Sequence, residues 1–205
     1  MTYDQRVTAD VTTVLWDADG VLQRPRTGWM DRLVELGGPD FPEAVFAAEA
    51  TVMAGGSFLS AVSDLVAATG IDLDPADVVA VWEGIELDPE ALAVVERVRA
   101  SGIRCVLATN QQDHRFAVMR DRFGYRDRMD SLRPSCEVGA AKPDPAYFTA
   151  LLELEDVSAA ESLFIDDKEA NVEAARSIGI HGAHHDPADG AAGLARILQQ
   201  YGVAA

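Results

Sequence analysis

The chain has 205 residues, of which 48% are hydrophobic and 25% charged, and this composition excludes a disordered or fibrous protein. Its formal net charge of −17 argues against nucleic acid and anionic membranes as partners, because both attract a basic face. The length fits one domain with room for a modest insertion. We therefore expect a packed globular protein with neither a nucleic-acid partner nor a membrane partner.

Residues 1–10 are polar and include acids, unlike a secretory leader, and no stretch approaches 18 apolar residues. The two cysteines, Cys105 and Cys136, do not form a disulfide framework, and Cys105 lies in an apolar run. We expect reduced thiols and a cytoplasmic location.

The first predicted element is a buried strand over residues 11–16, which is rich in β-branched and aromatic residues and stops at Asp17. Residues 25–88 follow a different pattern. Apolar residues recur there at helical spacing around residues 29–36, 41–53, 58–66 and 74–82, with glycine turns and no strand pattern between them. We predict a helical cap over residues 24–87, inserted into a core formed by residues 1–23 and 88–205.

Beyond this insertion, strand-like runs at residues 103–108, 162–165 and 178–183 alternate with amphipathic helical patterns. One such pattern places Tyr147, Leu151 and Leu154 on a common face. Alternating strands and helices predict an α/β fold with a parallel sheet.

Two carboxylates, Asp17 and Asp19, leave the end of the first predicted strand, and Gly20 permits a sharp turn after them. Residues two apart in an extended segment point to the same side, so one acid could attack a substrate while the other transfers protons. A simple turn is the alternative reading. The following residues lack the further acids of a calcium-binding loop.

Three more groups follow the later strands. Thr109 and Asn110 end the strand at 103–108 and could donate hydrogen bonds to a phosphate, or could cap the next helix. Lys142 lies in a loop stiffened by two prolines. Asp166 and Asp167 end another strand, where adjacent acids repel each other unless a cation binds them; oxygen ligands favour magnesium, and a capped helix start is the alternative.

All of these groups follow predicted strands or lie in the loops after them. In an open parallel sheet such loops meet at one edge, where ligands bind. Their order also resembles the four motifs of the haloacid dehalogenase-like hydrolase superfamily: Asp17-x-Asp19-Gly-Val, Thr109-Asn110, Lys142-Pro-Asp-Pro, and Phe-Ile-Asp166-Asp167-x-x-x-Asn171.

This resemblance implies a Rossmann-like three-layer core with a small all-α cap inserted after the first strand. It also implies a magnesium-dependent phosphatase in which Asp17 attacks phosphorus to form an aspartyl phosphate, while Asp19 protonates the leaving oxygen and then activates water. Thr109, Asn110 and Lys142 would hold the phosphate.

Mg²⁺ would bind the Asp17 carboxylate, the backbone carbonyl of Asp19 and the Asp166–Asp167 pair, with Asp167 as the direct ligand of that pair. A bound ion would offset the acids that otherwise repel an anionic substrate. True dehalogenases resemble this pattern but lack the second acid, so Asp19 favours a phosphatase.

Two alternatives remain open: a phosphomutase resembling β-phosphoglucomutase, and a non-catalytic binding protein on the same fold. The expected substrate is a small phosphorylated metabolite, such as a sugar phosphate or nucleotide. Arg24, Arg26 and Trp29 could reach the cleft, although surface ion pairs and core packing explain them equally well. The chain would act as a monomer or homodimer.

Overall fold

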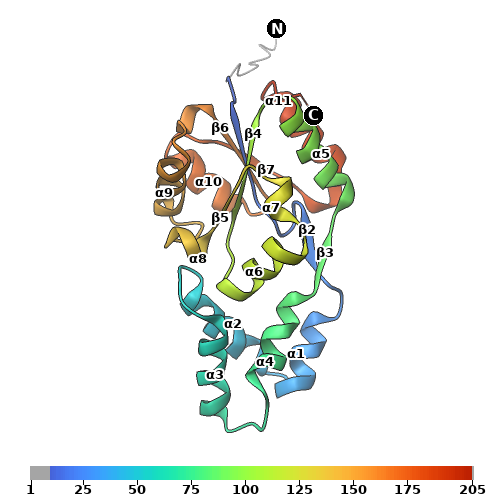
Figure 1. Ribbon diagram of the computed structural model, residues 1–205, viewed down its shortest axis with the longest axis vertical. Helices are drawn as coiled ribbons and strands as arrows, with labels where there is room; N and C mark the ends of the chain where they lie inside the picture. Colours follow the sequence, from blue (N-terminus) through green and yellow to red (C-terminus); the bar gives the residue numbers. More distant parts are fainter. Residues whose placement is uncertain (1–9, 205) are drawn as a thin grey trace.

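The computed structural model describes residues 10–204, so the polar residues 1–9 lie outside the described part. A five-stranded parallel sheet forms the centre of the molecule, in the order β5-β4-β1-β6-β7 (Figure 1). Its strands are β1 (Thr13–Trp16), β4 (Arg104–Thr109), β5 (Ser131–Pro134), β6 (Ser162–Asp166) and β7 (His181–His184). The predicted α/β fold with a parallel sheet is confirmed.

Two hydrophobic cores lie on opposite faces of the sheet because successive strand residues point to opposite sides. In β1, Val14 and Trp16 pack into one core, with α5 (Pro89–Ala100) and α11 (Gly190–Gln200). Leu15, between them, packs into the other core, with α9 (Pro145–Glu155) and α10 (Glu169–Ser177). The result is three layers, and the central strands are buried on both faces, as their continuous apolar sequences require.

Helix starts agree with local chemistry. Asp88 caps α5 by accepting hydrogen bonds from the backbone N–H groups of Glu90 and Ala91, at 2.9 and 3.0 Å. Asp144 caps α9 in the same way, and a proline follows each cap, where its missing N–H costs nothing. These caps fix where the chain leaves each loop and enters a helix.

Some details differ from the sequence prediction. The edge strand β5 was missed because it is short and only partly buried. Leu154 does not share the buried face of Tyr147 and Leu151; its exposed fraction is 56%, because the helix turns it towards solvent.

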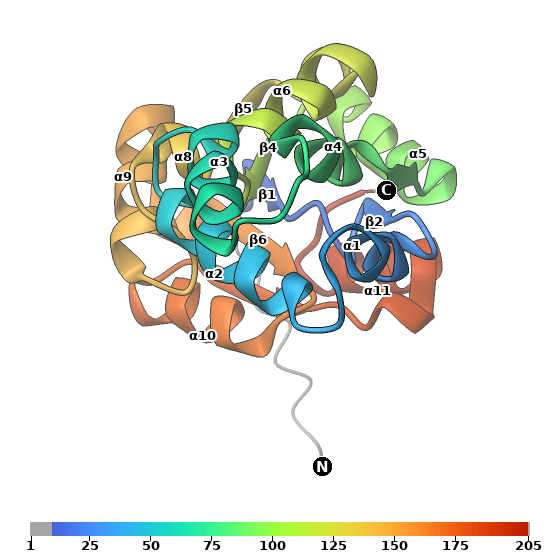
Figure 2. The same ribbon diagram turned by 90° about the horizontal axis from the view of Figure 1, so that it is seen from below.

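The inserted segment forms helices α1 (Trp29–Gly37), α2 (Phe41–Val52), α3 (Phe58–Thr69) and α4 (Pro75–Val79), followed by the 3-10 turn η1 (Ala80–Glu83). They lie at the end of the molecule opposite α11 (Figure 1), and Figure 2 shows them from below. A separate hydrophobic core holds them together, with Trp29, Phe46 and Phe58 packed edge-on around Trp82.

The chain enters and leaves this helical segment through a short antiparallel pair, β2 (Gln23–Pro25) and β3 (Ile85–Leu87). Both strands lie outside the predicted helical clusters at residues 29–82, and the pair itself was not predicted. These strands are too short to show an alternating pattern in the sequence.

The remaining elements are short or lie near the strand ends: α6 (Asp113–Arg122), α7 (Tyr125–Arg128), α8 (Ser135–Val138), η2 (Ala159–Glu161) and η3 (Pro187–Asp189). Both cysteines are free thiols, as expected, with Cys105 buried and Cys136 partly buried. Within residues 10–204, none of the helices has the length and apolarity needed to cross a membrane.

The two leucines of α9 give a matched test of the packing. Leu151 is fully buried and Leu154 largely exposed. We expect Leu151→Ala to lower the free energy of unfolding by about 2–5 kcal/mol, because it leaves a cavity. Leu154→Ala should change it by less than about 0.5 kcal/mol. Urea denaturation measures both, and equal losses would contradict the described orientation of α9.

Candidate active site

The predicted site residues meet at the carboxyl ends of β1, β4 and β6. All of them except the fully buried Asp166 line a cavity of about 330 Å³. Asp17 directly follows β1, Thr109 is the last residue of β4, and Asp166 is the last residue of β6. The residues that line the cavity are Asp17, Asp19, Gly20, Arg24, Pro25, Thr109, Asn110, Lys142, Asp167, Lys168 and Asn171. Parallel strands bring these groups together because their carboxyl ends share one edge.

Lys142 is buried between two carboxylates. Its Nζ lies 2.8 Å from Asp17 Oδ1 and 2.7 Å from Asp166 Oδ2, and it also donates to the carbonyl oxygen of Ala108 at 2.8 Å. Burial alone would lower the pKa of the Lys142 ammonium, but the charges of Asp17 and Asp166 outweigh it and hold that pKa above its usual value. The lysine is therefore a fixed positive charge inside the site.

Asp17 is the carboxylate most affected by this environment. Burial raises its pKa to about 6; the ammonium of Lys142 opposes that rise, and the nearby charge of Asp166 adds to it. When it is deprotonated, the Asp17 carboxylate is held with little solvation, and the ammonium of Lys142 stabilises its charge.

Asn110 holds the lysine loop. Its amide nitrogen donates to the backbone carbonyl of Lys142 at 2.8 Å, and its amide oxygen accepts from the backbone N–H of Lys142 at 2.9 Å. Both ends of the side chain are thus engaged with the loop that presents the ammonium. That Asn110 also holds a phosphate stays a prediction.

Asp166 and Asp167 are adjacent in sequence but differ in surroundings. Asp166 is fully buried, and it accepts hydrogen bonds from Lys142, the amide of Asn171 and the backbone N–H of Lys168. Asp167 has a buried Oδ1 without a hydrogen-bond partner, and burial, then the neighbouring Asp166, raises its pKa. An unpartnered buried carboxylate oxygen requires a ligand or a proton.

A divalent cation fits this requirement. Carboxylate oxygens of Asp17, Asp166 and Asp167 all lie within 4.8 Å of one another. Hard oxygen donors of this kind suit Mg²⁺. Because the Asp166 oxygens are already engaged with Lys142 and Asn171, Asp167 is the member of the pair with a free oxygen for the ion. The histidines at 181, 184 and 185 take no part in an acidic or metal-ligating group among the described residues.

Asp19 is surrounded by residues that the sequence reading did not single out. Arg115, on α6, donates to both of its oxygens, at 2.5 and 2.8 Å, and Gln111 and Gln23 donate at 2.8 and 3.2 Å. Burial would raise the pKa of Asp19, but the hydrogen bonds and charge of Arg115 outweigh it and lower that pKa. The available signal was the position of these residues directly after the second motif: Gln111 follows Asn110, and Arg115 lies in the first turn of α6.

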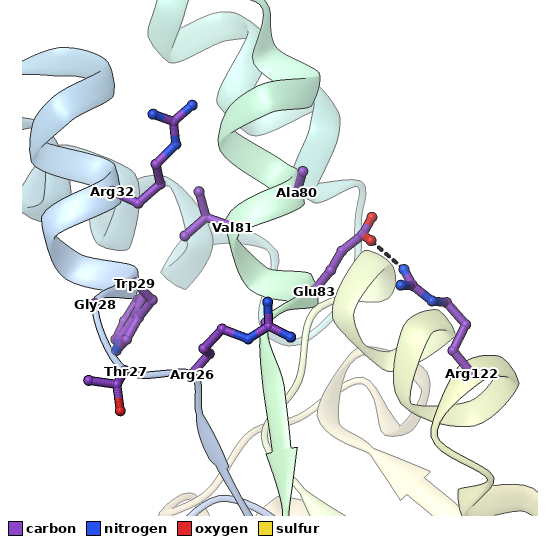
Figure 3. A pocket seen from close by; sticks show the side chains of 10 residues that line it. Arg26, Thr27, Gly28, Trp29, Arg32, Ala80, Val81, Glu83 and Arg122 are labelled. Carbon is purple, nitrogen blue, oxygen red and sulfur yellow. Dashed lines mark hydrogen bonds and ion pairs between the residues drawn. The ribbon is translucent and has the colours of Figure 1, made fainter.

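A second hollow, of about 360 Å³, lies away from these acids, between α1, η1 and the end of α6 (Figure 3). Arg26 and Trp29 line this hollow, whereas Arg24 lines the acidic cavity and pairs with Glu86. Of the three residues expected near the cleft, only Arg24 is thus at the site.

Comparison with known proteins agrees with this arrangement. A family model described as haloacid dehalogenase-like hydrolase matches residues 11–179. The chain belongs to this family. The resemblance read from the four motifs is therefore confirmed.

Individual members of the haloacid dehalogenase-like family match only part of this chain. GMP/IMP nucleotidase YrfG of Escherichia coli is 33% identical over 94 residues, which are 46% of this chain and 42% of that protein. The alignments span half or less of the curated relatives named for phosphatase or nucleotidase activity.

Solved structures of the family share the fold. A predicted HAD-like family hydrolase from Porphyromonas gingivalis has a TM-score of 0.81 at 22% identity, covering 93% of this chain and 99% of the other. The HAD family enzyme bt-2542 from Bacteroides thetaiotaomicron, in complex with magnesium and inorganic phosphate, has a TM-score of 0.74 at 21% identity, covering 85% and 94%.

Gly20 provides a test of the acidic cluster. A Cβ at this position would lie 2.5 Å from Asp167 Oδ2, whereas a Cβ at Gly102, which has a similar positive φ, would meet nothing within 4 Å. Either change to alanine should cost about 1–2 kcal/mol of unfolding free energy through backbone strain. Gly20→Ala should also weaken Mg²⁺ binding, measured by calorimetry, by about 10-fold or more. Equal Mg²⁺ affinity in the two variants would contradict this placement of Asp167.

Proposed function

We propose that this protein is a magnesium-dependent phosphatase that hydrolyses a small phosphomonoester through an aspartyl-phosphate intermediate. The observation that carries the proposal is that two acids with different basic partners line one cavity. Asp17 is hydrogen-bonded to Lys142, and Asp19 is hydrogen-bonded to Arg115. A phosphatase needs one acid to attack and another to move protons. The nucleotidase name of one relative and the magnesium and phosphate bound to a structural neighbour support the same chemistry.

In the first half-reaction, a carboxylate oxygen of Asp17 attacks phosphorus and the bond from phosphorus to the ester oxygen breaks. Asp19 gives a proton to the departing oxygen, which leaves as an alcohol; this step requires Asp19 to be protonated once the anionic substrate is bound, since its pair with Arg115 lowers its pKa. In the second half-reaction, Asp19 accepts a proton from water as the water attacks phosphorus and releases Asp17 and inorganic phosphate. The second acid is what favours this chemistry over dehalogenation.

Charge compensation is essential because the protein carries a net charge of −17 and its substrate is an anion. Lys142 and Thr109 are both buried at the cavity wall, and we expect them to hold phosphoryl oxygens; the three donors of Lys142 are engaged with Asp17, Ala108 and Asp166, so one of these contacts would be exchanged for the phosphate. Such preorganised donors stabilise the charge of the transition state without reorganising during the reaction.

Mg²⁺ would be held by the Asp17 carboxylate, the Asp19 carbonyl and Asp167, and when bound it would neutralise charge on the phosphoryl group. Asp166 takes the role of holding Lys142 and Asn171 in place, as its hydrogen bonds indicate. This division of labour assigns metal binding to one acid of the pair and positioning to its neighbour.

The helical segment over residues 24–87 would act as a cap that shields the cavity and selects the substrate. Its link to the core through β2 and β3 places Arg24 and Pro25 at the cavity wall. The substrate class that fits is a small phosphorylated metabolite, and a cavity of about 330 Å³ agrees with one.

The central test is phosphate release from p-nitrophenyl phosphate and a panel of sugar phosphates and nucleotides, with and without Mg²⁺. We expect release that requires Mg²⁺ and falls by at least ~10³-fold in Asp17→Asn, because an amide cannot form the aspartyl phosphate. Rearranged phosphoesters without free phosphate would indicate a mutase instead. The absence of any turnover by the wild type would contradict an enzyme.

The adjacent acids give a second test. Asp167→Asn should raise the Mg²⁺ concentration needed for half-maximal activity by about 10-fold or more, with activity partly restored by excess Mg²⁺. Asp166→Asn should lower kcat without such a rescue, because it releases Lys142 rather than the ion. Mg²⁺ titrations of both variants distinguish these roles, and an identical response would contradict the division between them.

A further inference from the structure

The Asp19 carboxylate accepts hydrogen bonds from three side chains, those of Gln23, Gln111 and Arg115. Oδ1 accepts hydrogen bonds from Arg115 Nη2 at 2.8 Å and Gln23 Nε2 at 3.2 Å. Oδ2 accepts from Arg115 Nη1 at 2.5 Å and Gln111 Nε2 at 2.8 Å. A carboxylate has about four acceptor sites, so these donors fix both the position and the rotation of the group.

Arg115 is itself fixed. It is only 7% exposed, its Nη1 also donates to Gln111 Oε1 at 3.2 Å, and its backbone N–H donates to the side chain of Gln112 at 3.0 Å. Gln111 therefore bridges the pair, accepting from Arg115 and donating to Asp19. This closed triangle leaves one arrangement of the three side chains.

The helix that carries Arg115 is tied to the inserted helices. The backbone N–H of Phe58, at the start of α3, donates to Asp113 Oδ1 at 2.9 Å. Glu83, at the end of η1, pairs with His114 at 3.2 Å and with Arg122, a contact drawn in Figure 3. Both ends of α6 thus contact the segment over residues 24–87.

Arg115 does not line the acidic cavity, and its two terminal nitrogens are committed to Asp19. Lys142 and Thr109, by contrast, are at the cavity wall. The geometry therefore separates Arg115 from the groups placed to bind a phosphate.

We propose that Arg115 is a positioning residue that holds the Asp19 carboxylate in place for proton transfer to the leaving group. This inference rests on the proposed phosphatase function. Arg115 acts through Asp19: the bidentate pair fixes the orientation of the carboxylate, and a contact with Gln23 or Gln111 must open when Asp19 carries the proton. The contacts of α6 with Phe58 and Glu83 help to hold Arg115 in position relative to the inserted helices.

A positioning role has a consequence that a general structural role lacks. An alkyl phosphate has a poor leaving group that must be protonated as the bond breaks, whereas p-nitrophenolate leaves without a proton. Loss of correct positioning should therefore slow the first half-reaction with an alkyl phosphate far more than with p-nitrophenyl phosphate. The value of kcat/KM reports that half-reaction, because it ends with release of the alcohol.

The experiment compares Arg115→Met, Arg115→Lys and the control Arg120→Met, which alters an arginine of the same helix that pairs with Asp121. The two substrates are glycerol phosphate and p-nitrophenyl phosphate. We expect Arg115→Met to lower kcat/KM for glycerol phosphate by ~10- to 100-fold and for p-nitrophenyl phosphate by less than ~3-fold. Arg115→Lys should recover part of the loss, and Arg120→Met should match the wild type. Thermal unfolding verifies that each variant is folded.

Equal losses for both substrates, or a rise in KM with unchanged kcat, would overturn the positioning role, since they would indicate misfolding or phosphate binding. Wild-type inactivity towards both substrates would count against the proposed function instead. A second measurement is independent of turnover: crystal structures of the wild type and Arg115→Lys. The proposal predicts that the Asp19 carboxylate rotates in the variant, and an unmoved carboxylate overturns it.

Discussion

The buried ammonium of Lys142 between Asp17 and Asp166 is the interaction on which the site depends. Without that charge, two carboxylates at the carboxyl ends of β1 and β6 would face each other inside the protein with little water to separate them. Removing one partner of a buried ion pair leaves an uncompensated charge and is strongly destabilising. The lysine therefore stabilises the folded state, and in the proposed mechanism it also stabilises the ionised form of Asp17.

The same constraint explains the loops around the site. Asn110 holds the backbone of Lys142 through two hydrogen bonds, and Asn171 holds Asp166 from the start of α10. Each of these amides follows a strand or begins a helix, so rigid elements support the groups that carry charge. Supporting contacts of this kind are what keep a reactive constellation within a productive geometry.

The pKa values of the two acids of the first motif, Asp17 and Asp19, are shifted in opposite directions. Burial raises the pKa of Asp17 to about 6, whereas Arg115 lowers the pKa of Asp19. A nucleophilic Asp17 and a proton-donating Asp19 need the opposite order, so the proposed roles require bound Mg²⁺ to lower the pKa of Asp17 and the bound anionic substrate to raise that of Asp19. Helix α6, which carries Arg115, contacts the helical segment over residues 24–87 through Phe58 and Glu83.

The sequence by itself determined the α/β class, the haloacid dehalogenase-like family and the strand ends at which Asp17, Thr109 and Asp166 lie. These follow from local patterns, because apolar runs and the residues that end them are adjacent in the chain. Only the tertiary structure decided that Arg115 forms a hydrogen-bonded pair with Asp19. The same is true of the hydrogen bond between Lys142 and Asp166 and of the unpartnered oxygen of Asp167. It also decided that Leu154 faces solvent. Those contacts join residues far apart in sequence or depend on the rotation of a helix, which spacing alone does not specify.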